Sequence, residues 1–257
     1  MVENAIQPMS LRSALLHFFI PAILAALNTY FVMAFFAGFG LPTFFNYIII
    51  YATIPMFLLL MASIIAYRRE GNEMSWLTFK QRFRLNKMTG KDWLWTIVLF
   101  LIMFLGAGVL SFTSFIIASF IPPPEFWPDE LNPLMSDSMG TVPTEFMGQL
   151  LPGNWWIAIV LLISLIIATI GEEFWWRGYI LPRQELEHGN KTWIIHGILW
   201  TLFHFFLPWN LIAILPGTLA LSYVAQKLKN TWPAIIAHGF ANGFMVILVV
   251  SLGILGG

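Results

Sequence analysis

The sequence predicts an all-α, polytopic membrane bundle of about seven transmembrane helices, or eight if one of the longer apolar runs is split. Three observations support this fold class. Of the 257 residues, 58% are hydrophobic and 10% are charged, whereas about 25% are charged in soluble proteins. Apolar runs near the roughly 20 residues that a helix needs to cross the hydrocarbon recur along the chain. Basic residues fall in alternate connecting segments, as they do in multi-pass membrane proteins.

The apolar runs define the expected elements in order. They are Leu15 to Phe36, Phe44 to Tyr67, Trp93 to Ile121, Trp155 to Ile170, Trp193 to Leu207, Leu211 to Ala225 and Trp232 to Leu255. The spans after Trp193 are short and closely spaced, so one of them is either a re-entrant segment or half of a split run. We expect residues 1–257 to form a single integral membrane domain, because this length leaves no room for a second soluble domain.

Lysine and arginine residues predict the orientation of these spans. They precede the first span and follow the second, fourth and sixth. The 122–154 loop has no basic residue and carries the acidic residues Glu125, Asp129, Glu130, Asp137 and Glu145. The positive-inside rule therefore predicts a cytoplasmic N-terminus and an outer C-terminus. Within one basic segment, residues 76–83 predict either a helix lying in the membrane interface or an ordinary connecting loop.

Charge and cysteine content exclude several classes of function. The net charge is zero and no basic tract lies near the ends of the chain, which argues against nucleic acid as a partner. The chain has no cysteine, and this excludes disulfides, thiol nucleophiles and thiolate zinc sites.

Polar side chains inside the later apolar runs are the strongest indication of function. They are Glu172, Glu173 and Arg177 at the end of the fourth run, His204 in the fifth, and His238 and Asn242 in the seventh. An ionisable group at membrane depth costs roughly 3 to 10 kcal/mol, depending on the reference state. Several such groups in one membrane domain predict a polar site inside the bilayer.

Helical spacing indicates how these groups divide their roles. Glu173 and Arg177 are i,i+4 neighbours on one face, whereas Glu172 points roughly 100° away. We expect Arg177 to pair with one carboxylate and to leave the other facing a cavity. His238 and Asn242 also share a face. At about 1.5 Å per residue, the glutamates and both histidines converge in the inner half of the bilayer, so the site is expected to open to the cytoplasm.

Each of these groups also has an ordinary structural interpretation. The two glutamates and Arg177 could form an ion pair at a helix end. His204 could be a core histidine bonded to a carbonyl group. His238 and Asn242 could form a hydrogen bond between helices. If there were no polar site, all three interpretations would have to hold at once. The gathering of the polar groups in consecutive C-terminal helices argues against this.

Three short motifs carry a family resemblance. Residues 172–177, EEFWWR, match the EExxxR motif of the CAAX protease and bacteriocin-processing (CPBP, or Abi) family. His204 matches the histidine of its FxxxH motif, and residues 238–242, HGFAN, match its HxxxN motif. The chain resembles this family because the three motifs occur in the family's order. The resemblance covers about residues 155–250, which would contain the catalytic helices. In one departure, Trp200 stands in place of the FxxxH phenylalanine.

The resemblance implies a glutamate-dependent intramembrane endopeptidase. If the roles of the family's motif residues apply to the matching positions, Glu172 and His204 activate a water molecule. His238 and Asn242 then stabilise the oxyanion, and Glu173 and Arg177 support the site. The implied substrate is a membrane-associated peptide or protein, which in eukaryotic relatives is a prenylated CAAX-type C-terminus. The expected partners are this substrate and the lipid bilayer, and no metal or cofactor is expected.

Two rival interpretations stay open. One is an intramembrane zinc metalloprotease with Glu172, His204 and His238 as ligands, a chemically reasonable set in a sequence without an HExxH motif. The other is a non-catalytic membrane binding protein, such as a bacteriocin-immunity factor. Metal removal would separate the first rival from a glutamate enzyme, and a proteolysis assay would separate the second.

Overall fold

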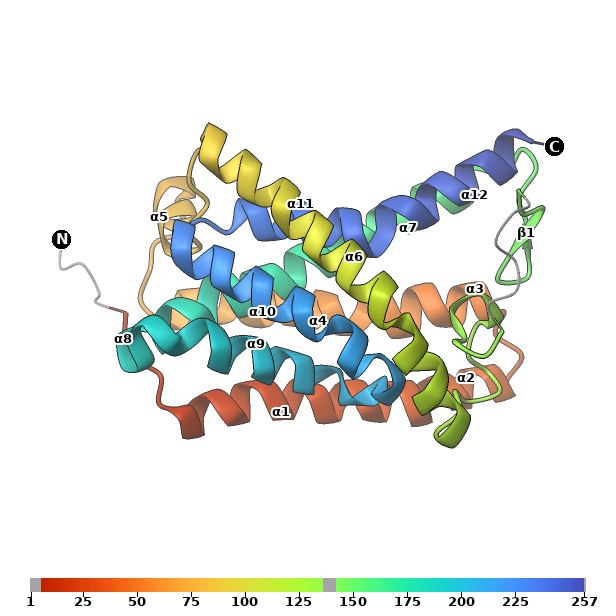
Figure 1. Ribbon diagram of the computed structural model, residues 1–257, viewed down its shortest axis with the longest axis horizontal. Helices are drawn as coiled ribbons and strands as arrows, with labels where there is room; N and C mark the ends of the chain where they lie inside the picture. The colour runs from red at the N-terminus through yellow and green to blue at the C-terminus, as the bar shows by residue number, and fades with distance from the viewer. Residues whose placement is uncertain (1–5, 136–141, 257) are drawn as a thin grey trace.

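The computed structural model describes residues 6–135 and 142–256, which form a bundle of helices with one short β-hairpin (Figure 1). The all-α membrane fold expected from the sequence is confirmed. Asp137, one of the acidic residues of the predicted outer loop, lies outside the described residues.

Two long helical stretches open the fold. The first joins α1 (Leu11–Leu27), the π-helix η1 (Asn28–Val32) and α2 (Met33–Gly38). The second joins α3 (Thr43–Phe45), the π-helix η2 (Asn46–Thr53) and α4 (Ile54–Arg69). Ser10 begins α1 by accepting the backbone N–H of Ser13 at 3.3 Å, which satisfies one of the free donors of the first turn.

The next two helices differ in length and role. Helix α5 (Trp76–Arg82) is short and contains the first residues of the predicted 76–83 interfacial segment. Helix α6 (Gly90–Phe120) has 31 residues, or about 46 Å of length at 1.5 Å per residue. It begins with a capping box between Thr89 and Asp92 and crosses the bundle obliquely (Figure 1). A helix longer than the hydrocarbon thickness is accommodated by such a tilt.

The connection between α6 and α7 holds the hairpin. It contains the 3₁₀ turn η3 (Asp129–Leu131) and the strands β1 (Glu145–Phe146) and β2 (Gln149–Leu150). The strands are antiparallel, with Phe146 opposite Gln149. Met147 and Gly148 form the turn, both with positive φ, as a two-residue hairpin of the primed type requires.

A continuous helical run follows and turns back on itself. It comprises α7 (Trp155–Glu173), the π-helix η4 (Phe174–Ile180), α8 (Leu181–His188), η5 (Gly189–Lys191), α9 (Thr192–Phe203) and η6 (His204–Phe206). Trp200 and Glu172 are in contact although 28 residues separate them, which a straight helix would not allow. Figure 1 places α8 at the end of the bundle where this turn occurs.

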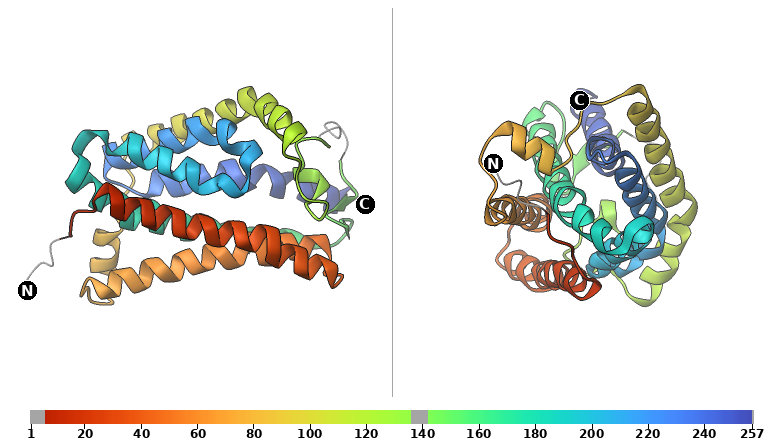
Figure 2. Two further views of the ribbon diagram at one scale, coloured as in Figure 1. Left: turned by 90° about the horizontal axis from the view of Figure 1, so that it is seen from below. Right: turned by 90° about the vertical axis from the view of Figure 1, so that its left-hand side faces the viewer.

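The C-terminal region adds η7 (Pro208–Asn210), α10 (Leu211–Leu228), α11 (Trp232–Gly239), the π-helix η8 (Phe240–Phe244) and α12 (Met245–Leu255). Helices α1 and α4 lie on one side of the bundle and α6 on the other (Figure 2). The first and last described segments lie at opposite ends (Figure 1).

The described residues contain five helical stretches long and apolar enough to cross a membrane, or six if the bent α11–α12 pair is one span. The chain is therefore an integral multi-pass membrane protein. The sequence predicted about seven spans. The difference arises because two predicted spans, Trp155 to Ile170 and Trp193 to Leu207, belong to the single 52-residue run 155–206.

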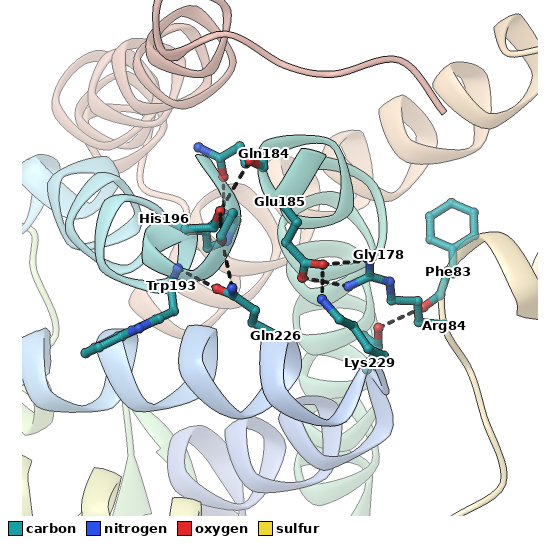
Figure 3. A network of polar contacts seen from close by, with 12 residues as sticks. Phe83, Arg84, Gly178, Gln184, Glu185, Trp193, His196, Gln226 and Lys229 are labelled. Atoms are coloured by element: carbon teal, nitrogen blue, oxygen red, sulfur yellow. Dashed lines mark hydrogen bonds and ion pairs between the residues drawn. The ribbon is translucent and has the colours of Figure 1, made fainter. Parts of the chain in front are cut away.

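A polar network joins the helix ends at the α8 end of the bundle (Figure 3). Arg84 donates two hydrogen bonds to the carboxylate of Glu185, at 2.7 and 2.9 Å, and Lys229 pairs with the same carboxylate. Nearby, Gln184 bonds the ring of His196. These contacts connect the segment after α5 to α8, α9 and α10.

Helix α5 is also attached to the helical run next to the EExxxR residues. Arg82 pairs with Glu70 at 2.6 Å and donates to the carbonyl of Gly178 at 2.8 Å. Phe83 is fully buried, whereas Trp76 is 66% exposed. A Cβ at Gly178 would lie 2.4 Å from the Phe83 ring, so this close approach requires glycine.

Candidate active site

Glu172 lies in the last turn of α7 and reaches a cavity of about 450 Å³. Its Oε2 accepts the indole N–H of Trp200 at 3.1 Å. The preceding residue lets α4 approach closely, because a Cβ at Gly171 would lie 2.2 Å from the carbonyl oxygen of Met56. Glu172 is 7% exposed, and its carboxylate is thus held by the protein on one oxygen.

Glu173 is fully buried and has different partners. Its Oε1 accepts Nη1 of Arg177 at 2.9 Å and Nδ1 of His238 at 2.8 Å. Arg177 is also fully buried. The prediction that Arg177 pairs with one of the two carboxylates is confirmed, and the paired one is Glu173. The ion pair also joins η4 to α11 through His238.

Arg177 has a second contact on the face of its guanidinium group. Its central carbon lies 3.5 Å from the centroid of the Trp200 ring, within the range of a cation–π interaction. Nε and Nη2 of Arg177 are buried without a hydrogen-bond partner among the described residues. The indole face therefore covers the part of the cation that Glu173 does not bind.

His204 begins η6, at the end of α9. Its Nδ1 lies 2.8 Å from the carbonyl oxygen of Trp200. A carbonyl only accepts, so Nδ1 carries the proton, and in the neutral ring Nε2 is left as the acceptor. His204 lines the same cavity as Glu172.

His238 and Asn242 lie on α11 and η8. The Asn242 amide nitrogen is 2.7 Å from Nε2 of His238. Nδ1 of the same ring is bonded to Glu173, so both ring nitrogens have protein partners. His238 is 3% exposed, whereas Asn242 is exposed to the cavity.

Two cavities meet at these residues. The first, of about 450 Å³, is lined by Glu172, His204 and Asn242, and it extends to Leu131 and Phe146 in the α6–α7 connection. The second, of about 490 Å³, lies between α6, α10 and α11, and its lining includes Trp200, His204, His238 and Asn242. His204 and Asn242 line both cavities, so the predicted site residues converge at their junction.

Two residues have contacts that sequence reasoning missed. Trp200 was noted as a departure from a motif, yet it touches both Glu172 and Arg177. Its position four residues before His204 was the available signal, because i,i+4 residues share a helical face. The second is His196, which is fully buried and whose Nδ1 lies 2.6 Å from Gln184 Oε1.

The described residues contain no group of three or more His, Cys, Asp or Glu side chains placed to hold a metal ion. The ligand set of the zinc alternative, Glu172, His204 and His238, is therefore not arranged as a metal site. Each of its members is instead bonded through one or more atoms to a protein group.

Comparison with known proteins agrees with the motif resemblance. Residues 154–244 match the family model described as type II CAAX prenyl endopeptidase Rce1-like. Neither the curated proteins nor the solved structures gave a significant match to the chain. The matched segment contains Glu172, His204, His238 and Asn242 and begins one residue before α7. Over residues 154–244 the chain is therefore similar to the Rce1-like type II CAAX prenyl endopeptidases.

Proposed function

We propose that this protein is a glutamate-dependent intramembrane endopeptidase that hydrolyses a peptide bond of a CAAX-type, membrane-associated substrate. The observation that carries the proposal is the meeting of Glu172, His204 and Asn242 at one cavity inside the helical bundle. A carboxylate and an imidazole acceptor on the same cavity are the groups that general-base activation of water requires.

Glu172 and His204 supply the base. Glu172 Oε2 is occupied by the Trp200 N–H, so Oε1 is the oxygen that takes the proton from the attacking water. Nε2 of His204 accepts the second hydrogen bond from this water and orients it. The hydroxide adds to the scissile carbonyl carbon, the C–N bond breaks, and the proton held by Glu172 passes to the leaving amine.

Asn242 and His238 stabilise the oxyanion that forms on the carbonyl oxygen. Asn242 has a second amide hydrogen beyond the one directed at His238. For His238 to donate as well, its Nε2 must carry a proton and its contact with Asn242 must open or invert. Loss of a single oxyanion donor costs about 3 kcal/mol in other hydrolases. Glu173 holds His238 through Nδ1, and Arg177 pairs with Glu173.

A prenylated CAAX-type peptide is the proposed substrate. The family description supports this chemistry, and the first cavity is lined largely by apolar side chains, including Tyr51, Leu161 and Leu165. Such walls fit a lipid-modified peptide, while the three polar groups at the junction of the cavities meet the bond to be cleaved.

The basic end of the bundle, which holds α5 and α8, is proposed to be cytoplasmic, with the N-terminus on that side. The predicted opening of the active site toward the cytoplasm stays a prediction. The first cavity also extends to Leu131 and Phe146 in the loop with the acidic residues. Water access to the site from that side would contradict the predicted cytoplasmic opening.

Glu172→Gln tests the proposed function. The amide has nearly the shape of the acid and still accepts the Trp200 N–H, but it does not take a proton. We expect cleavage of a farnesylated CAAX-type peptide, followed by mass spectrometry of the released tripeptide, to fall about 100-fold or more. Glu187→Gln, an exposed position on α8, is the control. Wild-type turnover in the Glu172 variant would refute the assignment, and intact peptide with the wild-type protein would refute the substrate class.

A further inference from the structure

Trp200 contacts the catalytic groups and their supporting cation together. Its N–H donates to Glu172 at 3.1 Å, and its ring covers Arg177 at 3.5 Å. Its backbone carbonyl accepts Nδ1–H of His204 at 2.8 Å. Its ring also lies edge-on to His238, with centroids 5.4 Å apart and an interplanar angle of 82°. The side chain is 2% exposed, so these contacts are shielded from solvent.

The hydrogen bond to Glu172 has a consequence for its orientation. An indole N–H is a donor only, so it binds one carboxylate oxygen and takes no proton from it. Glu172 is then fixed by Oε2, and Oε1 is left for water. Without this bond the side chain would rotate freely about its terminal torsion, which has no strong rotamer preference.

The cation–π contact places the indole ring against the cation that pairs with Glu173. Among the described residues the ion pair of Arg177 is with Glu173, while the face of its guanidinium lies on the indole. The cation thereby lies between one carboxylate and one aromatic ring. Glu172 receives a neutral donor instead of a cation, which orients the carboxylate without neutralising it.

We propose that Trp200 is a positioning residue that holds Glu172 by one oxygen and keeps Arg177 directed at Glu173. This inference rests on the proposed function of Glu172 as the base. A phenylalanine, the residue of the FxxxH motif, has no N–H, so the hydrogen bond to the base is a property of this chain.

A spectroscopic test examines the contact without any peptidase assay. In protein labelled with ¹⁵N-tryptophan, the indole N–H resonance lost in Trp200→Phe is that of Trp200. A hydrogen bond to a carboxylate is stronger than one to an amide, so this resonance should move upfield in Glu172→Gln. It should stay in place in Glu187→Gln. A resonance unmoved by Glu172→Gln would overturn the proposed bond.

A kinetic test then examines the role. Trp200→Phe keeps an aromatic ring over Arg177 and removes the donor. A hydrogen bond to a charged group contributes a factor of about 10 to 100, so we expect kcat for the farnesylated peptide to fall by this factor with KM unchanged. Trp193→Phe is the matched control, since Trp193 lies on the same helix and packs against Tyr223. It should keep the wild-type kcat.

A second variant separates the hydrogen bond from packing. Benzothienylalanine at position 200 keeps the bicyclic ring and replaces only the N–H with sulfur, and it should reproduce the loss of kcat. Wild-type kcat in this variant would overturn the positioning role. These outcomes are distinct from a failure of the proposed function, in which Glu172→Gln itself would remain active.

Discussion

Replacing Glu173 with glutamine should destabilise the protein strongly, although the two side chains have nearly the same size. Oε1 of Glu173 binds Arg177 at 2.9 Å and His238 at 2.8 Å, and neither Glu173 nor Arg177 is exposed. A glutamine carbonyl can still accept both hydrogen bonds. It cannot compensate the charge of Arg177, which then lies buried without its ion-pair partner.

The magnitude follows from the burial of this ion pair. Removing one partner of a fully buried pair costs about 3 to 5 kcal/mol, mainly because the other charge is left uncompensated. Because glutamine preserves the hydrogen bonds, we expect about 3 kcal/mol. The double variant Glu173→Gln/Arg177→Met lacks both charges of this pair and should be about 1 to 2 kcal/mol more stable than the single variant.

Unfolding by sodium dodecyl sulfate in mixed micelles, followed by far-UV circular dichroism, measures both differences. Glu187→Gln serves as the control, since Glu187 is exposed on α8 and should change the free energy of unfolding by less than about 0.5 kcal/mol. A loss below about 1 kcal/mol for Glu173→Gln would refute the reasoning. A double variant less stable than the single one would show that the cation–π contact of Arg177 outweighs its uncompensated charge.

Three further predictions concern turnover, metal and orientation. Asn242→Ala should lower kcat with little change in KM, because it removes a contact made mainly in the transition state; a change confined to KM would assign Asn242 to substrate binding. Activity should survive strong chelators, and elemental analysis should find substoichiometric metal, whereas zinc lost together with activity would favour the metalloprotease alternative. Reporter fusions after Asn86 and Lys229 should report the cytoplasm and a fusion near Asp137 the outside; an outer signal at Asn86 would overturn the orientation.

Composition and periodicity were sufficient to predict most of the fold. A span is a local property, because about 20 apolar residues suffice to define it. The turn that joins α7 to α9 was harder to predict. It comprises the π-helix η4, the helix α8 and the 3₁₀ turn η5, and the helical geometry is interrupted at Gly189, whose φ is +58°. Residues 174–191 carry its charged side chains, but hydropathy does not reveal that most of this polar segment is helical.

The polar site was predictable in its members and less so in its connections. The i,i+4 spacings of Glu173 with Arg177 and of His238 with Asn242 both correspond to contacts in the structure. The bond between Glu173 and His238 spans 65 residues, and no local pattern encodes it. Trp200 was missed for the same reason, since its partner Glu172 lies on another helix.

The π-helical segments are a further feature that hydropathy does not reveal. Residues of η1, η2 and η8 line the first cavity, and η4 carries Arg177. A π-helical turn widens the helix and occurs frequently at functional sites. Here Asn242 of η8 lines the cavity, whereas the apolar side chains of Phe240 and Phe244 in the same segment are exposed.

The adjacent glutamates place a supporting carboxylate and the proposed base at the end of one helix. Neighbouring residues on a helix point about 100° apart, so Glu172 and Glu173 cannot share an environment. Glu173 is fully buried and binds a cation and a histidine, whereas Glu172 reaches the cavity and binds a neutral indole. The bond from Glu173 to His238 joins α7 to α11 and thereby sets the position of His238 relative to the proposed base. If the two environments were exchanged, Arg177 would lie against the proposed base. Which of the two carboxylates binds Arg177 therefore matters more than the number of carboxylates.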